Sequence, residues 1–442
     1  MTRGADDRPS WDPGSPRLGL IEGFYGTPWS HAARLTLIRE LGALGLSTYL
    51  HAPKNELRGL ADLRSGAPLV AELGELAALG REQGVAFVHG LSPYKLLDPD
   101  DVPLLRKDGE RARRLVARRA RALREAGVER FAVLFDDTWA TLIPKLATEA
   151  TGRAHGDVAS VVEDVAGAEV WVVPAVYFGR ARELSAGARR YLVGLRASGR
   201  RPTAWTGPRI FSRFIGAADV AEFERATDLP LWIWSNAIAN DWLPLATGEP
   251  LGLRGNQRLC FGPVHSVSPG VVREHPVLLN GARERLPTLV ALHVLSDLAR
   301  AGDLHEPARA IERAIESVCG EHAAVVQRIA DAVGAHSLVF PHLNRAGPFE
   351  RAHGGSSGAR RDVLEEHLEL LAGTVVDLAR AAESDPRLLE LLPTAERITE
   401  TAHTLRRRLG GSPREPAPRS TWSTSLERYL DPERLTRLLL RR

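Results

Sequence analysis

Short apolar runs alternate with helix-like segments over the first 300 residues of the chain. An apolar run of a few residues that is bounded by turn residues predicts a strand buried on both faces. The segments between the runs carry apolar residues at helical spacing, and the first of them, residues 31–45, stops at a glycine. The eight runs are residues 18–26, 46–53, 85–93, 131–135, 169–179, 201–208, 229–237 and 275–282.

Eight strands separated by roughly 30 to 45 residues, with helical segments between them, are typical of a (β/α)8 barrel. The sequence therefore predicts the α/β class and a TIM-like barrel. An open, doubly wound sheet is the alternative. Eight repeats that end near residue 300 fit a closed barrel better.

Beyond residue 300 the strand-like runs stop and amphipathic helical patterns follow. These patterns predict an all-α helical C-terminal domain. The first residues are polar and contain Pro and Gly, which favours a disordered leader. The predicted organisation is a leader over 1–16, a barrel over 17–300 and a helical domain over 301–442, with mobile linkers near 338–361 and 410–420.

The stretch from Phe131 to Trp139 places two adjacent carboxylates, Asp136 and Asp137, directly after an apolar strand. Acids at the mouth of a buried strand are costly in free energy unless solvent, a partner or a substrate meets them. The simplest alternative is a turn in which one Asp caps the following helix. Because the active site of such a barrel forms at the carboxyl ends of its strands, both acids are candidate site residues.

Polar or aromatic residues also stand at the ends of nearly all the other strands. Taken singly, each has a structural explanation as a turn former, a packed ring or a solvated charge. Together, amides, acids, a lysine and aromatic faces are the groups that bind a sugar ring, whose hydroxyls need polar partners and whose C–H face packs on rings. These residues are Gly23, Tyr25, Trp29, Lys54, Asn55, Tyr177, Trp205, Asn236, Asn240, Asp241 and Asn280.

Composition and charge narrow the class of protein further. The chain has 442 residues and a formal net charge of +3, and its Arg-rich segment 111–127 interleaves Ala and Leu, which favours a solvated helix face over a nucleic-acid-binding surface. Cys260 and Cys319 form no metal or redox motif, and we expect no cofactor. No apolar run is long enough to span a membrane, and the first residues lack the apolar core of a signal peptide. We therefore expect a soluble, cytoplasmic protein.

Six motifs, IEGFYGTPW, YLHAPKNE, LFDDTW, AWTGPRI, WSNAIANDW and RLCFGPV, follow one another along the chain. In this order they resemble glycoside hydrolase family 84, the O-GlcNAcase and bacterial β-N-acetylglucosaminidase family. The resemblance covers roughly residues 17–300. It implies a barrel that hydrolyses terminal β-linked N-acetylglucosamine by a retaining, substrate-assisted mechanism without a metal.

The resemblance also implies a role for each matching residue. Asp136 would orient and polarise the substrate's acetamido group, Asp137 would act as general acid and base, and Tyr177 would lie beside the acetamido oxygen. Asp241 would bind the distal hydroxyls, and Asn236 would supply a pocket amide. The remaining matches would hold the ring or form an aromatic wall of the pocket: Lys54, Asn280, the backbone of Gly23, and Trp205.

The adjacency of Asp136 and Asp137 independently favours this mechanism. Neighbouring Cα atoms lie about 3.8 Å apart, and strand side chains alternate in direction. A conventional retaining pair must flank the glycosidic bond, with carboxyl groups about 5 to 5.5 Å apart. Two consecutive residues are better placed if one protonates the leaving oxygen and the other steadies an internal nucleophile, such as a 2-acetamido carbonyl.

The chain departs from the family pattern at three places, which bear on the leaving group. Lys54 is followed by Asn-Glu where acidic pairs are common, Val176 precedes Tyr177 where a glutamate is usual, and the segment after Asp241 looks like an insertion.

Two other functions stay open. One is a metal-dependent hydrolase in which Asp136, Asp137 and Asp241 hold a divalent cation through oxygen ligands, although no His-x-His cluster accompanies them.

The other alternative is a sugar-binding barrel that has kept the pocket and lost turnover. The expected partner in each sugar-directed case is an N-acetylglucosamine-containing glycan, a glycoprotein or a small glycoside. Neither nucleic acid nor membrane is expected as a partner, and the sequence does not indicate an oligomeric state.

Overall fold

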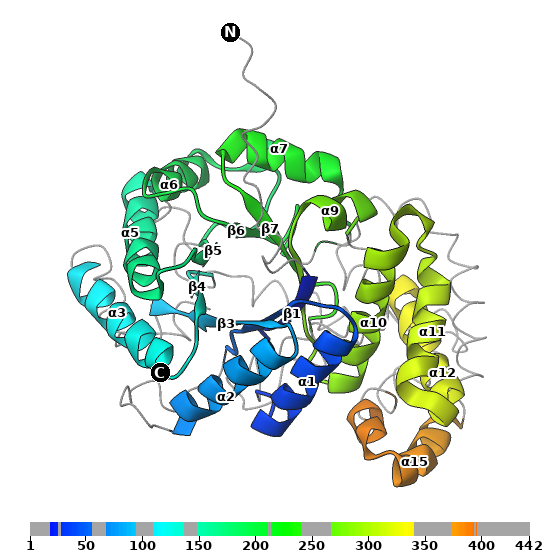
Figure 1. Cartoon of the computed structure of the whole chain (residues 1–442). Helices are drawn as coiled ribbons and strands as arrows, with labels where there is room; N and C mark the ends of the chain where they lie inside the picture. The colour runs from blue at the N-terminus through cyan, green and yellow to red at the C-terminus, as the bar shows by residue number, and fades with distance from the viewer. Residues whose placement is uncertain are drawn as a thin grey trace, which may run out of the picture.

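The computed structural model describes residues 18–24, 28–54, 68–93, 109–136, 148–210, 212, 214–239, 267–339, 373–392 and 395. Within them, eight parallel strands form a closed barrel in which each strand pairs with the next and β8 pairs with β1 (Figure 1). The strands are β1 (Leu18–Glu22), β2 (Thr48–His51), β3 (Ala86–Leu91), β4 (Arg130–Leu134), β5 (Trp171–Val173), β6 (Thr203–Trp205), β7 (Leu231–Ser235) and β8 (Val277–Asn280). The predicted barrel is confirmed, and each strand overlaps one of the eight apolar runs.

Helices surround the barrel and cover its outer face (Figure 1). They are α1 (His31–Ala43), α2 (Pro68–Glu82), α3 (Gly109–Glu125), α5 (Glu149–Ala166), α6 (Ala186–Ala197), α7 (Ala217–Thr227), α9 (Pro269–Glu274) and α10 (Arg285–Ala301). Three begin after a residue whose hydroxyl accepts a hydrogen bond from the backbone N–H three positions on: Ser30, Thr148 and Ser185. Because these hydroxyls satisfy N–H groups that lack partners inside the helix, the sequence sets where each helix starts.

The alternation of side chains along each strand separates two apolar layers. On β4, Leu134 belongs to the cluster inside the barrel, whereas Val133 packs outward against the helices. On β8, Leu278 points inward and Leu279 outward. Since this phase continues into the first residue or two beyond a strand, it determines which side chains reach the mouth of the barrel.

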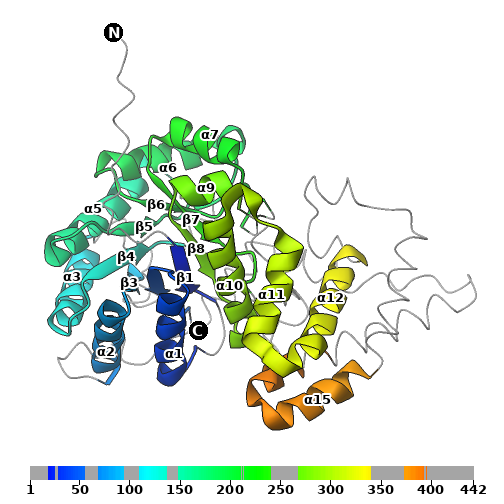
Figure 2. The same ribbon diagram turned by 45° about the vertical axis from the view of Figure 1, so that its right-hand side comes forward.

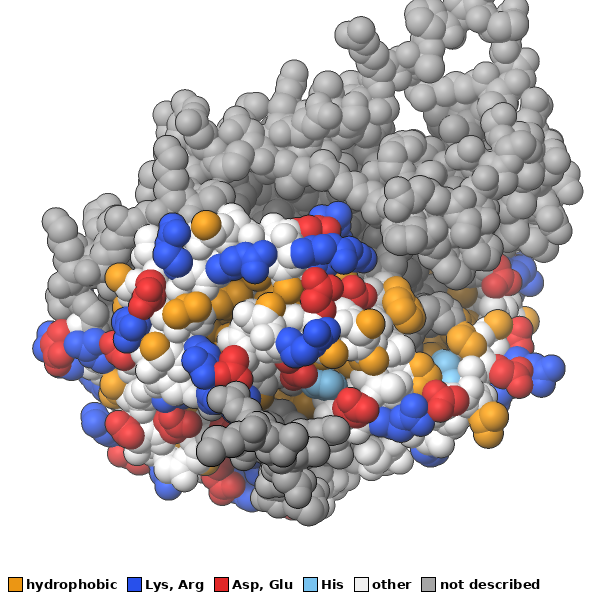
Figure 3. Space-filling view, turned by 90° about the horizontal axis from the view of Figure 1, so that it is seen from above, with side chains coloured by type: hydrophobic (Ala, Val, Ile, Leu, Met, Phe, Trp, Pro, Cys, Tyr) orange, Lys and Arg blue, Asp and Glu red, His pale blue; other side chains and the backbone are white. Residues whose placement is uncertain are grey.

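Charged side chains of both signs are interleaved on the face drawn in Figure 3. On α3, Glu110 forms ion pairs with Arg113 and Arg114 of the Arg-rich segment. Such pairs are typical of a solvated helix surface. Among the described helices, none combines the length and the apolar character needed to cross a lipid bilayer.

The described residues beyond the barrel form helices that pack outward from α10 (Figure 2). In turn, α11 (Pro307–Cys319) contacts α10, α12 (Ala323–Val339) contacts α11, and α15 (Thr374–Ser384) contacts α12. Short 3-10 helices are η4 (Ala181–Glu183), η6 (Gly302–Leu304), η7 (Gly320–His322) and η9 (Pro386–Leu391).

The domain boundary at residue 300 stays a prediction. The leader and the linker near 410–420 lie outside the described residues, as does the linker near 338–361 beyond the end of α12.

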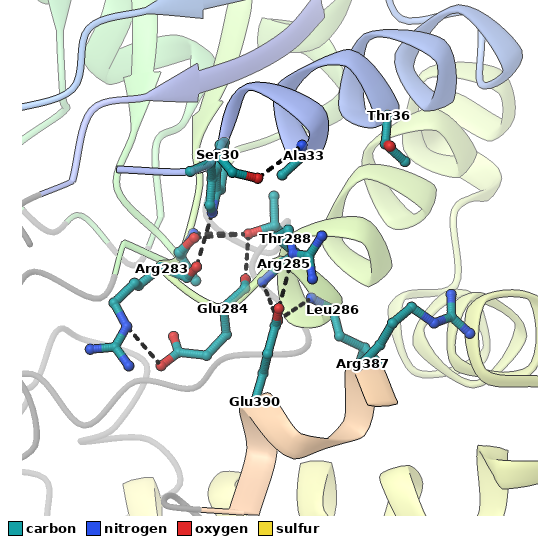
Figure 4. A network of polar contacts seen from close by, with 12 residues as sticks. Ser30, Ala33, Thr36, Arg283, Glu284, Arg285, Leu286, Thr288, Arg387 and Glu390 are labelled. Carbon is teal, nitrogen blue, oxygen red and sulfur yellow. Dashed lines mark hydrogen bonds and ion pairs between the residues drawn. The ribbon is translucent and has the colours of Figure 1, made fainter. Parts of the chain in front are cut away.

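Glu390 on η9 joins these C-terminal helices to the barrel (Figure 4). Its carboxylate accepts hydrogen bonds from the backbone N–H groups of Arg285 (2.6 Å) and Leu286 (3.3 Å) and from Arg285 Nε (2.9 Å). The residue that precedes α10, Glu284, makes no side-chain capping bond of its own. A side chain 105 positions away therefore caps the helix that follows β8.

Candidate active site

Five of the predicted site residues stand at positions that continue the inward-facing alternation of their strands. Each stands two positions after a residue of the inner apolar cluster, at or just beyond the carboxyl end of its strand. The pairs are Ile21 and Gly23, Ala52 and Lys54, Leu134 and Asp136, Trp234 and Asn236, and Leu278 and Asn280. The barrel thus brings these five residues, from β1, β2, β4, β7 and β8, to one end of its interior.

A salt bridge joins Lys54 and Asp136 across the mouth of the barrel. The two side chains expose only 8% and 10% of their surface. Lys54 Nζ also lies over the ring of Trp234, 5.7 Å from its centroid. A carboxylate so far removed from water needs a partner, and the ammonium group balances its charge. The sequence analysis did not predict this pairing, since it assigned Lys54 only to the sugar ring.

Hydrogen bonds tie the amides of β7 and β8 to one another and to β1. Asn280 Nδ2 donates to Asn236 Oδ1 (2.9 Å), which also accepts from Trp234 Nε1 (2.7 Å). The backbone N–H of Gly23 donates to Asn280 Oδ1 (3.0 Å), and Asn236 Nδ2 donates to the carbonyl of Ile210 (2.9 Å). Because each amide bonds to its neighbours, the network fixes the orientation of both Asn side chains.

Position 23 requires a glycine because its backbone lies in close contact with the side chains of Trp234 and Asn280. A Cβ atom at this position would lie 2.6 Å from Trp234 Cζ2 and 2.9 Å from Asn280 Oδ1. Both distances are shorter than van der Waals contact, so the backbone of β1 can approach the amide network only without a side chain.

Tyr177 lies in the segment that follows β5, at the same end of the barrel, and is 6% exposed. Its carbonyl accepts a hydrogen bond from the backbone N–H of Thr206 (2.8 Å), just beyond β6. Its ring meets Phe178 edge-on, with centroids 5.4 Å apart. These contacts anchor the Tyr177 backbone to the end of the neighbouring strand.

Trp205 does not lie with the other site residues. It is fully buried in the outer layer, where its ring stacks on Phe223 of α7 with centroids 5.0 Å apart, and its Nε1 donates to the carbonyl of Gly179 (3.1 Å). On β6 the inward position belongs to Ala204. The predicted role of Trp205 as a pocket wall does not fit this placement. Among the described tryptophans, it is Trp234 whose ring lies beside Lys54 at the barrel mouth.

Two predicted site residues, Asp137 and Asp241, lie outside the described residues, as do Tyr25, Asn55 and Asn240. The proposed general acid and the proposed ligand of the distal hydroxyls thus stay predictions from the sequence. Within the described part of the chain, no three His, Cys, Asp or Glu side chains gather closely enough to hold a metal ion. The divalent-metal alternative involves Asp137 and Asp241, so that finding does not bear on it.

The sequence analysis missed a buried ion pair under β1. The carboxylate of Glu22 accepts two hydrogen bonds of 2.8 Å from Arg34 on α1. It also accepts one from the Tyr49 hydroxyl (2.6 Å) and one from the backbone N–H of Trp29 (3.1 Å). Burial raises the pKa of Glu22, while the bonds from Arg34 act in the opposite direction. The signal was present in the sequence, because one acid interrupts an apolar strand and Arg34 interrupts the apolar face of α1.

Comparison with known proteins places this geometry in context. The family model beta-N-acetylglucosaminidase matches residues 18–331. Curated relatives include Protein O-GlcNAcase of Rattus norvegicus, 27% identical over 290 residues, and its counterpart in Mus musculus, 26% identical over 290 residues. Each match covers 63% of this chain and 29% of the relative. The chain therefore matches less than a third of the length of these relatives.

Solved structures give the same fold. A variant of the O-GlcNAc hydrolase of Thermobaculum terrenum superposes with a TM-score of 0.66, covering 88% of this chain and 82% of that one. The two sequences are 18% identical, so this likeness supports the barrel and its helical surroundings.

Proposed function

The chain belongs to the beta-N-acetylglucosaminidase family, and we propose that it hydrolyses terminal β-linked N-acetylglucosamine with retention of configuration. The observation that carries the proposal is the inward position of Asp136 at the end of β4, in a salt bridge with Lys54, whose Nζ lies over the Trp234 ring. The Asn236–Asn280 amide pair lies at the ends of two other strands of the same barrel. Acid, cation, amides and an aromatic face are the groups that recognise a 2-acetamido sugar.

In the first step, the substrate's own acetamido oxygen attacks the anomeric carbon. Asp136 accepts a hydrogen bond from the acetamido N–H, which makes the carbonyl oxygen more nucleophilic, and Tyr177 lies beside that oxygen. The bond from the anomeric carbon to the leaving oxygen breaks, and Asp137 transfers its proton to this oxygen. The product is a protonated oxazoline, an oxazolinium ion whose N–H still donates to the Asp136 carboxylate, and it is formed with the advantage of a nucleophile already held at the reacting centre.

In the second step, water attacks the anomeric carbon from the face that the leaving group has vacated. Asp137, now a carboxylate, takes a proton from this water while the bond between the anomeric carbon and the oxazoline oxygen breaks. The acetamido group is restored and Asp137 is protonated again. Two inversions at one carbon give net retention of the β configuration.

The remaining residues bind the sugar ring. Lys54 lies at Asp136 and remains within reach of a ring hydroxyl, and Trp234 takes the place proposed for Trp205 as the aromatic wall. The Asn236–Asn280 network orients amide groups toward the ring, and Asp241 holds the distal hydroxyls. Gly23 contributes its backbone and leaves space for the ring.

The names of the curated relatives support N-acetylglucosamine linked to protein as the substrate to test first. Chitin-like or hyaluronan-like oligomers and small glycosides are the competing substrates, and they differ in the leaving group that they carry. A screen of these leaving groups at a fixed N-acetylglucosamine unit ranks them by kcat/KM.

The decisive experiment uses aryl N-acetyl-β-glucosaminides with zero, one, two and three fluorines on the acetyl methyl. Turnover should fall steeply with each fluorine, because the acetamido oxygen becomes less nucleophilic, and NMR should show the β-anomer as the first product. The aryl β-glucoside without an acetamido group serves as the control and should not react. A flat rate across the fluorine series, or an α-anomer, would refute the substrate-assisted mechanism. Turnover abolished by a chelator would favour the metal-dependent hydrolase, and tight binding without turnover would favour the sugar-binding barrel.

A further inference from the structure

Helices α5 and α6 lie in backbone contact behind β4 and β5. A Cβ atom at Gly152 on α5 would lie 2.0 Å from the carbonyl oxygen of Tyr191, and one at Gly194 on α6 would lie 2.0 Å from that of Glu149. Only glycine permits this approach. The two helices therefore hold His155 of α5 and Tyr191 of α6 as a buried pair, and these side chains are 1% and 0% exposed.

The Tyr191 hydroxyl bonds to the chain between β5 and Tyr177. It accepts a hydrogen bond from the backbone N–H of Ala175 (3.0 Å) and lies 2.8 Å from His155 Nδ1. Strand β5 has only three residues and ends at Val173, so Ala175 lies beyond the strand ladder. The hydroxyl gives this buried N–H a partner, two residues before Tyr177.

The other member of the pair contacts the strand that carries Asp136. The imidazole of His155 stacks on the ring of Phe135, with centroids 3.9 Å apart and planes at 4°. Phe135 immediately precedes Asp136, and its N–H donates to the carbonyl of Val173 at the end of β5 (2.8 Å). One buried cluster thus contacts the backbone leading to Tyr177 and the residue before Asp136.

We propose that Tyr191 and His155 are positioning residues that fix Tyr177 relative to Asp136, acting through the Ala175 amide and the Phe135 ring. The inference rests on the proposed function, in which both residues act on one acetamido group although they come from different strands. A displacement of about 1 Å between such groups costs about 100-fold in rate. The short β5 leaves this relative position to the helices.

The chemistry of the pair supports a fixed hydrogen bond. Burial lowers the pKa of His155 to about 3, so the imidazole stays neutral near pH 7. While the hydroxyl oxygen accepts from Ala175, its own hydrogen can be donated to Nδ1 of the neutral ring. The bonds give the hydroxyl a defined direction.

The test is Tyr191→Phe, which keeps the ring and removes the hydroxyl. We expect kcat for an aryl N-acetyl-β-glucosaminide to fall about 10- to 100-fold with a much smaller change in KM. Ser198→Ala is the matched control, because Ser198 joins α6 to the same α5 by bonding the Arg153 carbonyl and Asp157, both at 3.1 Å, on the exposed side of the pair. The control should leave kcat unchanged, and an equal fall in both variants would overturn the proposal.

A double-mutant cycle separates positioning from general destabilisation. If Tyr191 acts through Tyr177, Tyr191→Phe should cost much less kcat in a Tyr177→Phe background than in the wild type, because the group it positions is already removed. All variants are assayed well below their unfolding temperatures. Fully additive losses would show that Tyr191 does not act through Tyr177.

Amide hydrogen exchange gives a readout that does not depend on turnover. In Tyr191→Phe the amides of residues 175–178 should exchange faster than in the wild type, while those of β4 and of the far ends of the helices should not change. Wild-type protein that hydrolyses no N-acetylglucosaminide would refute the proposed function, and the exchange data would still judge the positioning. Unchanged exchange over 175–178 would overturn the inference itself.

Discussion

The carboxylate of Asp136 and the ammonium group of Lys54 form a salt bridge at the mouth of the barrel, where neither side chain exposes more than a tenth of its surface. Two strands that are not neighbours in the barrel, β2 and β4, supply the pair. An acid that must receive an acetamido N–H needs to be ionised and fixed in direction. The salt bridge provides a counter-charge for it in a nearly water-free position.

Lys54→Met should therefore damage both stability and turnover. Removing one partner of a buried pair leaves the other charge uncompensated, at a cost of about 3 to 5 kcal/mol in the free energy of unfolding. Urea unfolding measures this cost. In an Asp136→Asn background, the same Lys54→Met change should cost much less, because no carboxylate is left unpaired. Equal costs in the two backgrounds would show that the pair does not contribute as a unit.

The two adjacent acids should respond differently to the leaving group. Asp137→Asn should lower kcat/KM about 10² to 10⁴-fold for poor leaving groups and much less for activated aryl ones, because a good leaving group needs no proton. Asp136→Asn should lower both, since it acts on formation of the oxazoline. The measurement is kcat/KM over aryl glycosides of graded phenol acidity. Equal losses for Asp137→Asn across the whole series would reverse the two assignments.

The placement of the two tryptophans gives a matched pair of variants. Trp234→Phe should raise KM for an N-acetylglucosaminide, because it shrinks the ring face beside Lys54 and removes the donor to Asn236. Trp205→Phe should lower the unfolding temperature and leave KM unchanged, because Trp205 packs on Phe223 in the outer layer. The reverse result would restore Trp205 as the wall of the pocket.

The sequence predicts the barrel because each strand is a short apolar run that is bounded by polar or turn-forming residues. It also predicts Lys54, Asp136, Asn236 and Asn280 as candidates, since each stands at the end of an apolar run, and the structure adds that each lies two positions after an inward-facing residue. Trp205 shows where that reasoning needed one further step. Position at a strand end does not determine which way a side chain faces, and the structure places Ala204 inward and Trp205 outward.

Other parts of the structure depend on contacts that no local pattern encodes. Glu390 caps α10 from 105 residues away. The bond between Tyr191 and His155 depends on how closely α5 and α6 approach. Such pairings follow from the packing of whole elements, so they emerge only once the fold is known. The roles of Asp137 and Asp241 stay predictions, because both lie outside the described residues.

Glu390→Gln should weaken the attachment of the C-terminal helices to the barrel. The change removes the charge that caps α10 and pairs with Arg285, so we expect a loss of about 1 to 2 kcal/mol in the free energy of unfolding. Glu383→Gln is the matched control, since Glu383 is an exposed acid on the neighbouring helix α15. KM should not change in either variant. An equally stable Glu390→Gln protein would show that the cap contributes nothing.

His155 should make the protein sensitive to acid. Burial lowers its pKa from 6.5 to about 3, so the folded state keeps the imidazole neutral while the unfolded chain takes up a proton as the pH falls below about 6.5. Between these two values the unfolded state binds more protons than the folded state. The free energy of unfolding therefore rises with pH in this window. The stabilisation is complete above about pH 6.5 and is lost as the pH falls toward 3.

The size of this effect follows from the linkage relation. Between pH 7 and pH 5 the neutral imidazole should account for a loss of about 2 kcal/mol in the free energy of unfolding. His155→Gln keeps an acceptor near the Tyr191 hydroxyl but cannot take up a proton in this range, so its stability should fall less over the same interval. Urea unfolding at both pH values, for wild type and variant, gives the difference. Because other titrating groups act equally in both proteins, the difference isolates His155. The same pH dependence in the two proteins would show that His155 does not titrate with so low a pKa.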